Sequence, residues 1–157
     1  MSGLIGGSIG FGLSLILRLE LALPGFILCS SLQYNSTITF HGLFMIFFMI
    51  MPILIGGFGN ILLPIMLCSS DMIFPRLNAL SLWLVFDSLV IMILAMFIDG
   101  GVNAGWTFYV PLSIINYSSI DFMFFSLHIV GLSSLLGSIN FIVTLLKSSN
   151  LSIINSG

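Results

Sequence analysis

The sequence predicts an all-α protein, a polytopic bundle of about four transmembrane helices. Two observations carry this prediction: 59% of the 157 residues are hydrophobic and only 5% are charged, whereas soluble domains are roughly half apolar and one quarter charged. So few charged side chains cannot solvate a globule of this size, which excludes a water-soluble domain. A net charge of −2 also provides no basic surface for nucleic acid. We therefore expect a lipid membrane as partner, and no nucleic acid.

Four predominantly apolar stretches are long enough, or nearly long enough, to cross a bilayer, which takes ~20 residues. They cover residues 4–19, 39–67, 78–98 and 122–146. The first is short and rich in glycine, so we expect residues missing before Met1 to complete it. The small polar residues 148–157 predict a tail or linker, which leaves residues 1–147 as the part that carries the helices.

The charged and aromatic residues outside the stretches predict the orientation. Four crossings place Arg76 and Lys147 on one side, and the excess of basic residues makes that side cytoplasmic or matrix-facing. The opposite side then holds the acidic residues and an aromatic loop suited to a membrane interface, namely Glu20, Asp99, Asp121, Trp106 and Tyr109.

Two histidines lie within the apolar stretches, where an ionisable group costs several kcal/mol unless it meets a partner or a water-filled cavity. His41 begins a long run of Phe, Met and Ile, and both a metal ligand and a histidine hydrogen-bonded to a neighbouring helix fit this position. A ligand would need a second ligand from elsewhere. His128 lies in the fourth stretch, which starts on the same side of the membrane as the second, so pairing with His41 is geometrically possible. The small residues around His128 nevertheless favour a structural role in helix packing.

Further polar residues follow the second, third and fourth stretches. Asp71 lies at the inner mouth between the second and third stretches, and Ser81 and Ser88 share a helix face because they are seven residues apart. The set could hold a file of water leading inward from the carboxylate, or it could ease close helix packing. Its other members are Asn60, Asn78, Ser126, Ser133, Ser134, Ser138 and Asn140.

Asp87 is the remaining ionisable residue inside a stretch. It precedes Ser88 in the third stretch. Burial disfavours the charged form of a carboxyl group, so Asp87 is either protonated or facing a neighbouring chain.

Four segments together resemble haem-copper oxidase subunit 1 of the cytochrome c oxidase type. They cover nearly the whole chain up to Lys147 and match in order and loop length. They read LRLELALPG, YNSTITFHGLFMIFFMIMPILIGGFGN, SSDMIFPRLNALSLW, and AGWTFYVPL followed by SLHIVGLSSLLGSINFIVT. The sequence departs from the family pattern at Val110, where a second proline is usual, at Asp99, where glutamate is usual, and at Asp87.

The resemblance implies a haem site. By it, His41 falls on an axial ligand of the low-spin haem a, and Arg18 falls on the arginine that hydrogen-bonds the haem formyl group. Such a contact would tune the haem's potential. Tyr34, Gly105 and Trp106 fall on positions near the same haem.

The resemblance also implies a proton-uptake pathway and a cation site. Asp71 falls on the mouth of the pathway, and its polar lining would comprise Asn60, Asn78, Ser81, Ser88, Ser126, Ser133, Ser134 and Asn140. Glu20 and the backbone of Gly25 fall on a peripheral calcium or sodium site, for which oxygen ligands are appropriate.

In the family, these helices are part of a twelve-helix core, and the copper ligands, the second haem's ligand and the second ligand of haem a come later in the subunit. We therefore expect one piece of a split subunit, or a partially built one, with copper and the second haem on a complementary polypeptide that carries the remaining spans. Expected partners are the copper-bearing subunit and cytochrome c, in the mitochondrial inner membrane or, alternatively, a bacterial membrane. The alternative functions are a quinol-oxidising relative and a haem-free membrane scaffold.

Overall fold

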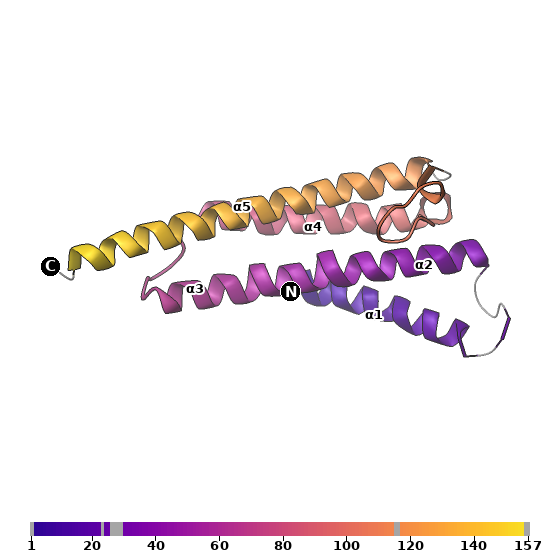
Figure 1. Cartoon of the computed structure of the whole chain (residues 1–157), viewed down its shortest axis with the longest axis horizontal. Helices are drawn as coiled ribbons and strands as arrows, with labels where there is room; N and C mark the ends of the chain where they lie inside the picture. Colours follow the sequence, from indigo (N-terminus) through magenta and orange to yellow (C-terminus); the bar gives the residue numbers. More distant parts are fainter. Residues whose placement is uncertain (1, 23, 26–29, 115–116, 156–157) are drawn as a thin grey trace.

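The computed structural model describes residues 2–22, 24–25, 30–114 and 117–155. Their regular structure is helical (Figure 1). Four helical segments are long and apolar enough to cross a membrane, which confirms the predicted number of spans. They are Ser2–Glu20, Ser31–Met66, Pro75–Gly100 and Ser118–Lys147.

The first span is α1 (Ser2–Glu20), and the second is a continuous rod made of α2 (Ser31–Leu43), two π-helical segments (Phe44–Ile50 and Pro52–Gly59) and α3 (Asn60–Met66). The third and fourth spans are α4 (Pro75–Phe97) and α5 (Tyr117–Asn155). Helix α1 packs on α2 and the first π-helical segment, and α4 packs along α5. The backbone of α5 continues through much of the predicted tail, as far as Asn155.

The second span begins at Ser31, eight residues before the expected start at Thr39. Ser30 caps the helix, because its hydroxyl accepts the Gln33 backbone N–H at 3.4 Å while the Gln33 side-chain oxygen accepts the Ser30 backbone N–H at 3.0 Å. This capping box satisfies donors that the first helical turn leaves free. The polar residues that precede Thr39 are therefore helical rather than part of a loop.

The middle of the second span is wound more loosely than an α-helix. The Met51 N–H donates to the carbonyl of Ile46, five residues earlier, and Pro52 follows directly. Because proline has no N–H, it cannot continue the α-helical hydrogen-bond pattern. The wider turns begin three residues after His41, so they set the side-chain directions beyond it.

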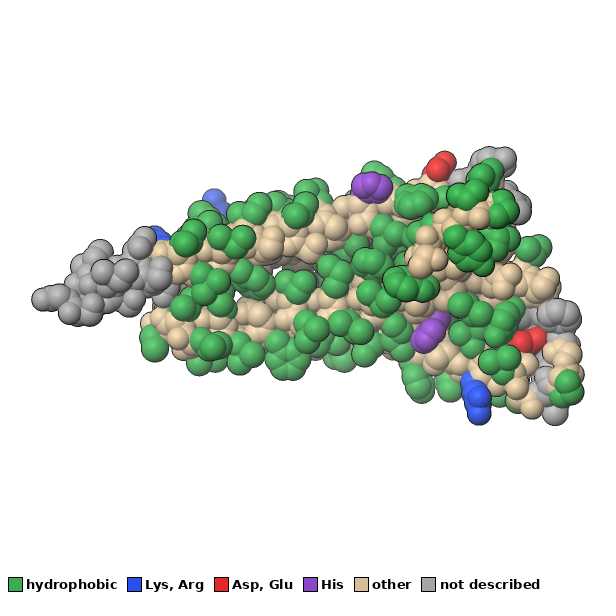
Figure 2. Space-filling model, viewed as in Figure 1, with side chains coloured by type: hydrophobic (Ala, Val, Ile, Leu, Met, Phe, Trp, Pro, Cys, Tyr) green, Lys and Arg blue, Asp and Glu red, His purple; other side chains and the backbone are tan. Residues whose placement is uncertain are grey.

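Figure 1 shows the connections gathered at two ends of the bundle. One end holds the α1–α2 and α4–α5 connections, and the other holds the α3–α4 connection and the C-terminus. This confirms the predicted grouping of residues at the two ends, while the assignment of one end to the cytoplasm or matrix stays a prediction. Hydrophobic side chains extend along the length of the visible face between these ends (Figure 2).

A row of phenylalanines joins the two helix pairs. Phe40, Phe44 and Phe48 are fully buried and follow one another at four-residue intervals, with ring centroids 6.4 and 5.6 Å apart. They belong to one core cluster with Met92 of α4 and Met123 of α5. This cluster holds α2 at a fixed position against the helix pair that carries most of the polar residues.

Candidate functional site

His41 is half-buried in α2 and contacts the backbone of α1. Its Nδ1 lies 2.9 Å from the Gly10 carbonyl oxygen. Because a carbonyl can only accept, Nδ1 carries the proton, and in the neutral ring Nε2 presents a lone pair. The hydrogen bond to a neighbouring helix is the one that the structural interpretation of His41 predicted, and it leaves the second nitrogen available to a ligand.

The close approach of α1 makes this hydrogen bond possible. A Cβ atom on Gly6 would lie 2.5 Å from the Phe48 carbonyl oxygen, and one on Gly10 would lie 3.1 Å from the Met45 sulfur. Only glycine allows backbones to approach this closely. Sequence reasoning missed Gly10, whose signal is the spacing of Gly3, Gly6 and Gly10 along one helix face.

The loop between α4 and α5 docks on α2 beside His41. The Gly105 N–H donates to the Thr39 hydroxyl at 3.0 Å, and the Trp106 Cβ lies 3.4 Å from the position of a Cβ on Gly42. Gly105 has φ +71°, a conformation that glycine adopts without strain. The structure thus brings Gly105 and Trp106 next to the turn that carries His41. They are attached there through Thr39 and Gly42, two residues that the sequence did not indicate.

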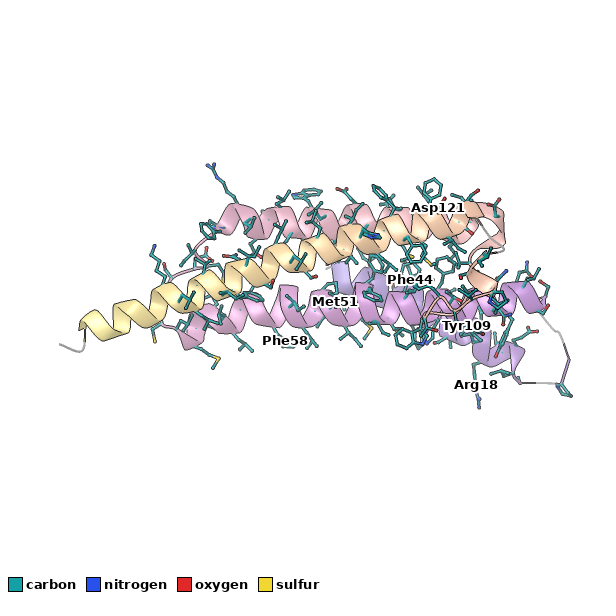
Figure 3. All side chains as sticks on the ribbon, turned by 45° about the horizontal axis from the view of Figure 1, so that its top comes forward. Arg18, Phe44, Met51, Phe58, Tyr109 and Asp121 are labelled. Carbon is teal, nitrogen blue, oxygen red and sulfur yellow. The ribbon has the colours of Figure 1, made fainter. Side chains whose placement is uncertain are left out.

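Arg18 and Tyr34 lie towards the end of the bundle that holds the α1–α2 connection. Arg18 is eight residues beyond Gly10 on α1, and Tyr34 is seven residues before His41 on α2, which correspond to ~12 and ~10 Å along the helix axes. Arg18 is exposed and projects from α1 away from the other helices (Figure 3). Tyr34 is half-buried.

His128 is not drawn into a common site with His41. It is exposed on α5, and its Nδ1 lies 2.6 Å from the Phe124 carbonyl of its own helix. Within the described part of the chain, no group of three His, Cys, Asp or Glu residues is placed to hold a metal ion.

The residues predicted for a peripheral cation site lie at the end of α1. Glu20 is its last residue and is only 6% exposed, and Gly25 is exposed with φ +109°. Leu23 and residues 26–29 of this connection lie outside the described residues. The cation site therefore stays a prediction.

Five of the predicted proton-pathway residues line one cavity of about 620 Å³. The cavity lies between the second span and the α4–α5 pair, and these residues are Asn60, Asn78, Ser81, Ser133 and Ser134. Water occupies ~30 Å³ per molecule in the liquid, so the cavity has room for several waters. The side-chain N–H₂ of Asn60 donates to the Asn78 oxygen at 3.0 Å, while the Asn60 oxygen is buried without a hydrogen-bond partner among the described residues.

The other predicted pathway residues, Ser88, Ser126 and Asn140, form a regular series of hydrogen bonds (a ladder) between α4 and α5, together with Ser81 and Ser133 of the cavity wall. The hydroxyls of Ser126 and Ser133 donate to the carbonyls of Ser88 and Ser81, at 2.6 and 2.7 Å. Asn140 accepts the Phe74 N–H at 3.1 Å and donates to the Phe74 carbonyl at 3.2 Å. Successive rungs are seven residues apart on both helices, which keeps every rung on the contact face. These side chains therefore act in helix packing, and Ser88 and Ser126 are fully buried.

Asp71 lies at the inner end of this ladder, in the connection between α3 and α4. It is exposed, and its carboxylate accepts the Met72 N–H at 2.7 Å. Asn140 binds the backbone at Phe74, three residues further along the same connection. Asp71 thus lies outside the cavity that the five polar residues line, and its role as the mouth of a proton pathway stays a prediction.

These features define a polytopic helical membrane protein with a half-buried histidine bonded to a neighbouring helix, and with a mainly apolar cavity between its spans that five polar side chains line. A family model described as cytochrome c and quinol oxidase polypeptide I matches residues 1–155. The chain belongs to this family. It is therefore part of a haem-copper oxidase subunit 1, as its motifs indicated.

Curated relatives named cytochrome c oxidase subunit 1 match almost the whole chain. The protein of Pecten maximus is 51% identical over 151 residues, which are 94% of this chain and 32% of the relative. The protein of Yarrowia lipolytica is 48% identical over 92% of this chain and 28% of its own length. That of Mytilus edulis is 49% identical over 91% and 27%. The chain thus spans about a third of the length of these relatives and corresponds to their amino-terminal part.

Proposed function

We propose that the chain forms the amino-terminal part of the catalytic subunit of a cytochrome c oxidase, in which His41 is an axial ligand of low-spin haem a. The observation that best supports the haem-ligand role of His41 is the hydrogen bond from its Nδ1 to the Gly10 carbonyl. Metal-binding histidines typically donate their second ring nitrogen to a backbone carbonyl or carboxylate, which fixes the tautomer and the ring orientation. The residues present therefore fit a haem iron at Nε2.

A bound haem supplies one-electron transfer. The chain's own residues orient His41 through Gly10 and close one side of its surroundings with Gly105 and Trp106. Arg18 and Tyr34 lie about two helical turns away along α1 and α2, and the family resemblance supports a role for both beside the haem. By the family resemblance, Arg18 would donate to the haem formyl group. Such a guanidinium hydrogen bond would tune the haem's potential.

The remaining spans of the subunit, on the same or on a separate polypeptide, would supply the second axial ligand, the copper site and the second haem. The relatives' name, cytochrome c oxidase subunit 1, supports cytochrome c as the electron donor. By the family resemblance, a copper-bearing subunit would be an intermediate partner and oxygen would be reduced to water. Eukaryotic relatives support the mitochondrial inner membrane. Glu20 and Gly25 would hold a calcium or sodium ion at the end of α1.

The cavity that the five polar side chains line is the proposed route for protons. Protons would enter beside the exposed carboxylate of Asp71, pass Asn140 and continue along waters between Asn60, Asn78, Ser81, Ser133 and Ser134. The Asn60 oxygen, which has no partner among the described residues, supports this role, because a buried acceptor on a cavity wall is a binding point for water. Ser88 and Ser126 would extend the polar path only by exchanging their present backbone hydrogen bonds for bonds to water.

The haem assignment is tested by Arg18→Ala in the assembled complex. Removal of the formyl donor should shift the absorption maximum and the potential of the low-spin haem while the complex still assembles. Arg18→Lys keeps the charge but loses the planar pair of donors, so it should give an intermediate spectrum. An unaltered spectrum in both variants would refute the formyl contact.

The proton route is tested by Asp71→Asn, which removes the exchangeable carboxylate but preserves the side-chain shape. Turnover should slow, and fewer protons should be taken up per electron in reconstituted vesicles. Asp121→Asn is a control, since Asp121 is an exposed carboxylate on the opposite end of α5. Unchanged turnover and proton uptake in Asp71→Asn would remove Asp71 from the route.

A further inference from the structure

The walls that α4 and α5 give to the cavity begin and end with apolar residues. Along α5 the wall runs from Val130 to Phe141, which is ~16 Å along the helix axis. Val130 and Val85 belong to the buried core cluster, so the core closes the cavity towards the α4–α5 connection. Towards Asp71 the last wall residues are Phe141 on α5 and Pro75 on α4. Because hydrocarbon holds no water, water from the side of Asp71 has to pass Phe141 and Pro75.

The Phe141 ring bridges α5 and the second span at this end of the cavity. Its Cζ and Cε2 atoms lie 2.8 and 3.2 Å from the position of a Cβ on Gly59, the residue before Asn60. One turn earlier on both helices the sizes are reversed, because a Cβ on Gly137 would lie 3.9 Å from the Ile55 side chain. The tip of the ring therefore rests on the Gly59 backbone, which serves as its seat.

The polar neighbours of the ring are already bonded to backbone groups. The Asn140 side chain holds both the N–H and the carbonyl of Phe74. The Thr144 hydroxyl accepts the Ile73 N–H at 3.4 Å and donates to the Asn140 carbonyl at 2.7 Å. Asn140 and Thr144 are only 1% and 2% exposed, so these bonds hold the α3–α4 connection on α5. The half-buried Phe141 ring has no hydrogen bond to lose, and it can leave its seat by a change of side-chain rotamer.

We propose that Phe141 is the gate of the proton route. Seated on Gly59, its ring separates the water at Asp71 from the water in the cavity, and a change of its rotamer joins the two. A water molecule needs two to four polar partners, and an aromatic ring edge in contact with a glycine offers none. Phe141 thus controls the passage of protons without carrying them. The proposal rests on the proposed function of the cavity as a proton route.

The test measures access to the cavity independently of proton transport. Gly137→Cys places a thiol in the cavity wall one turn beyond Phe141, and its Cβ meets no atom closer than 3.9 Å. The assembled complex is reconstituted in vesicles with the Asp71 side outward, and a membrane-impermeant methanethiosulfonate cation is added. Mass spectrometry of the peptide that contains position 137 gives the rate of modification. Minor conformational states are populated to ~0.1–10%, so Phe141→Ala, which leaves the gate open, should raise this rate at least ~tenfold.

Ile142→Ala in the same Gly137→Cys background is the matched control. It removes the apolar side chain of the next residue, which is 55% exposed and is not part of the cavity wall. Equal rates of modification in Phe141→Ala and Ile142→Ala would overturn the proposal.

Gly59→Ala gives a second test with Phe141 intact. The added Cβ takes away the seat of the ring, so the rate should rise as it does in Phe141→Ala. Gly131→Ala on α5 should leave the rate unchanged, because its Cβ meets no atom within 4 Å and Gly131 lies outside the cavity wall. Equal rates in Gly59→Ala and Gly131→Ala would contradict a ring seated on Gly59.

The gate and the proton route can fail separately. A rate that responds to Phe141→Ala, while Asp71→Asn leaves proton uptake unchanged, would support the gate and refute the route. A rate that ignores Phe141→Ala, while Asp71→Asn slows proton uptake, would refute the gate alone.

Discussion

The contact of α1 with the second span predicts that Gly6→Ala disturbs the orientation of His41. The added Cβ would lie 2.5 Å from the Phe48 carbonyl oxygen and 2.7 Å from the Phe48 Cβ. An ordinary contact begins at 3.4 Å, so the two backbones must separate by the difference, about 0.9 Å. The carbonyl oxygen is a backbone atom and the Cβ is bonded directly to the backbone, so neither can swing aside.

A displacement of that size acts on the His41 hydrogen bond, because Gly10 is one turn from Gly6 on the same helix. The Nδ1–oxygen distance would rise from 2.9 Å towards ~3.8 Å, beyond the range of a hydrogen bond. Overpacking of this kind destabilises proteins by about 1–3 kcal/mol. We therefore expect a lower melting temperature of the complex together with a broadened and shifted low-spin haem band.

Gly12→Ala provides a matched control. It makes the same substitution in the same helix, but the added Cβ meets no atom within 4 Å. It shares the gain in helix propensity that alanine brings. Differential scanning fluorimetry and reduced-minus-oxidised spectra of both variants test the reasoning, which fails if Gly6→Ala and Gly12→Ala behave alike.

Two further predictions concern the hydrogen bonds that hold the site together. Asn140→Leu leaves the Phe74 N–H and carbonyl without their partner, and each unpaired group should lower the free energy of unfolding by about 1–3 kcal/mol. Ser138→Ala is the control, because the Ser138 hydroxyl bonds only its own helix. Equal melting temperatures of the two variants would contradict this prediction. Thr39→Val removes the acceptor of the Gly105 N–H, so hydrogen exchange of the Gly105 amide should accelerate. Thr37→Val should not accelerate it, because the bond lost there lies within α2. Unchanged exchange in Thr39→Val would show that Thr39 does not hold the loop.

The sequence predicts the number of spans because long apolar runs leave few alternatives in a membrane protein. It places their ends less well, since helix ends depend on capping and packing rather than on hydropathy. The residues from Ser31 to Thr39 are polar enough to resemble a loop, yet the Ser30–Gln33 capping box starts the helix before them. The loose winding around Pro52 is also invisible to a pattern of apolar residues.

The site was predictable only in part. The seven-residue spacing of Ser81 and Ser88 indicates a common face, but not that Ser126 and Ser133 donate to their backbone carbonyls. The partner of His41 is likewise a carbonyl, and any residue type can supply one, so the sequence does not single out Gly10. Family resemblance indicated Gly105 and Trp106, whereas their attachment through Thr39 and Gly42 follows from the packing of the loop.

The most direct test of the central claim is the reduced-minus-oxidised absorption spectrum, with pyridine haem analysis, of the native complex and of its His41→Leu and His128→Leu variants. We predict haem A in the native complex, loss of the low-spin signal in His41→Leu, and a native spectrum in His128→Leu, whose ring is exposed and bonded to its own helix. An intact low-spin signal in His41→Leu, or a native complex without haem, would contradict it.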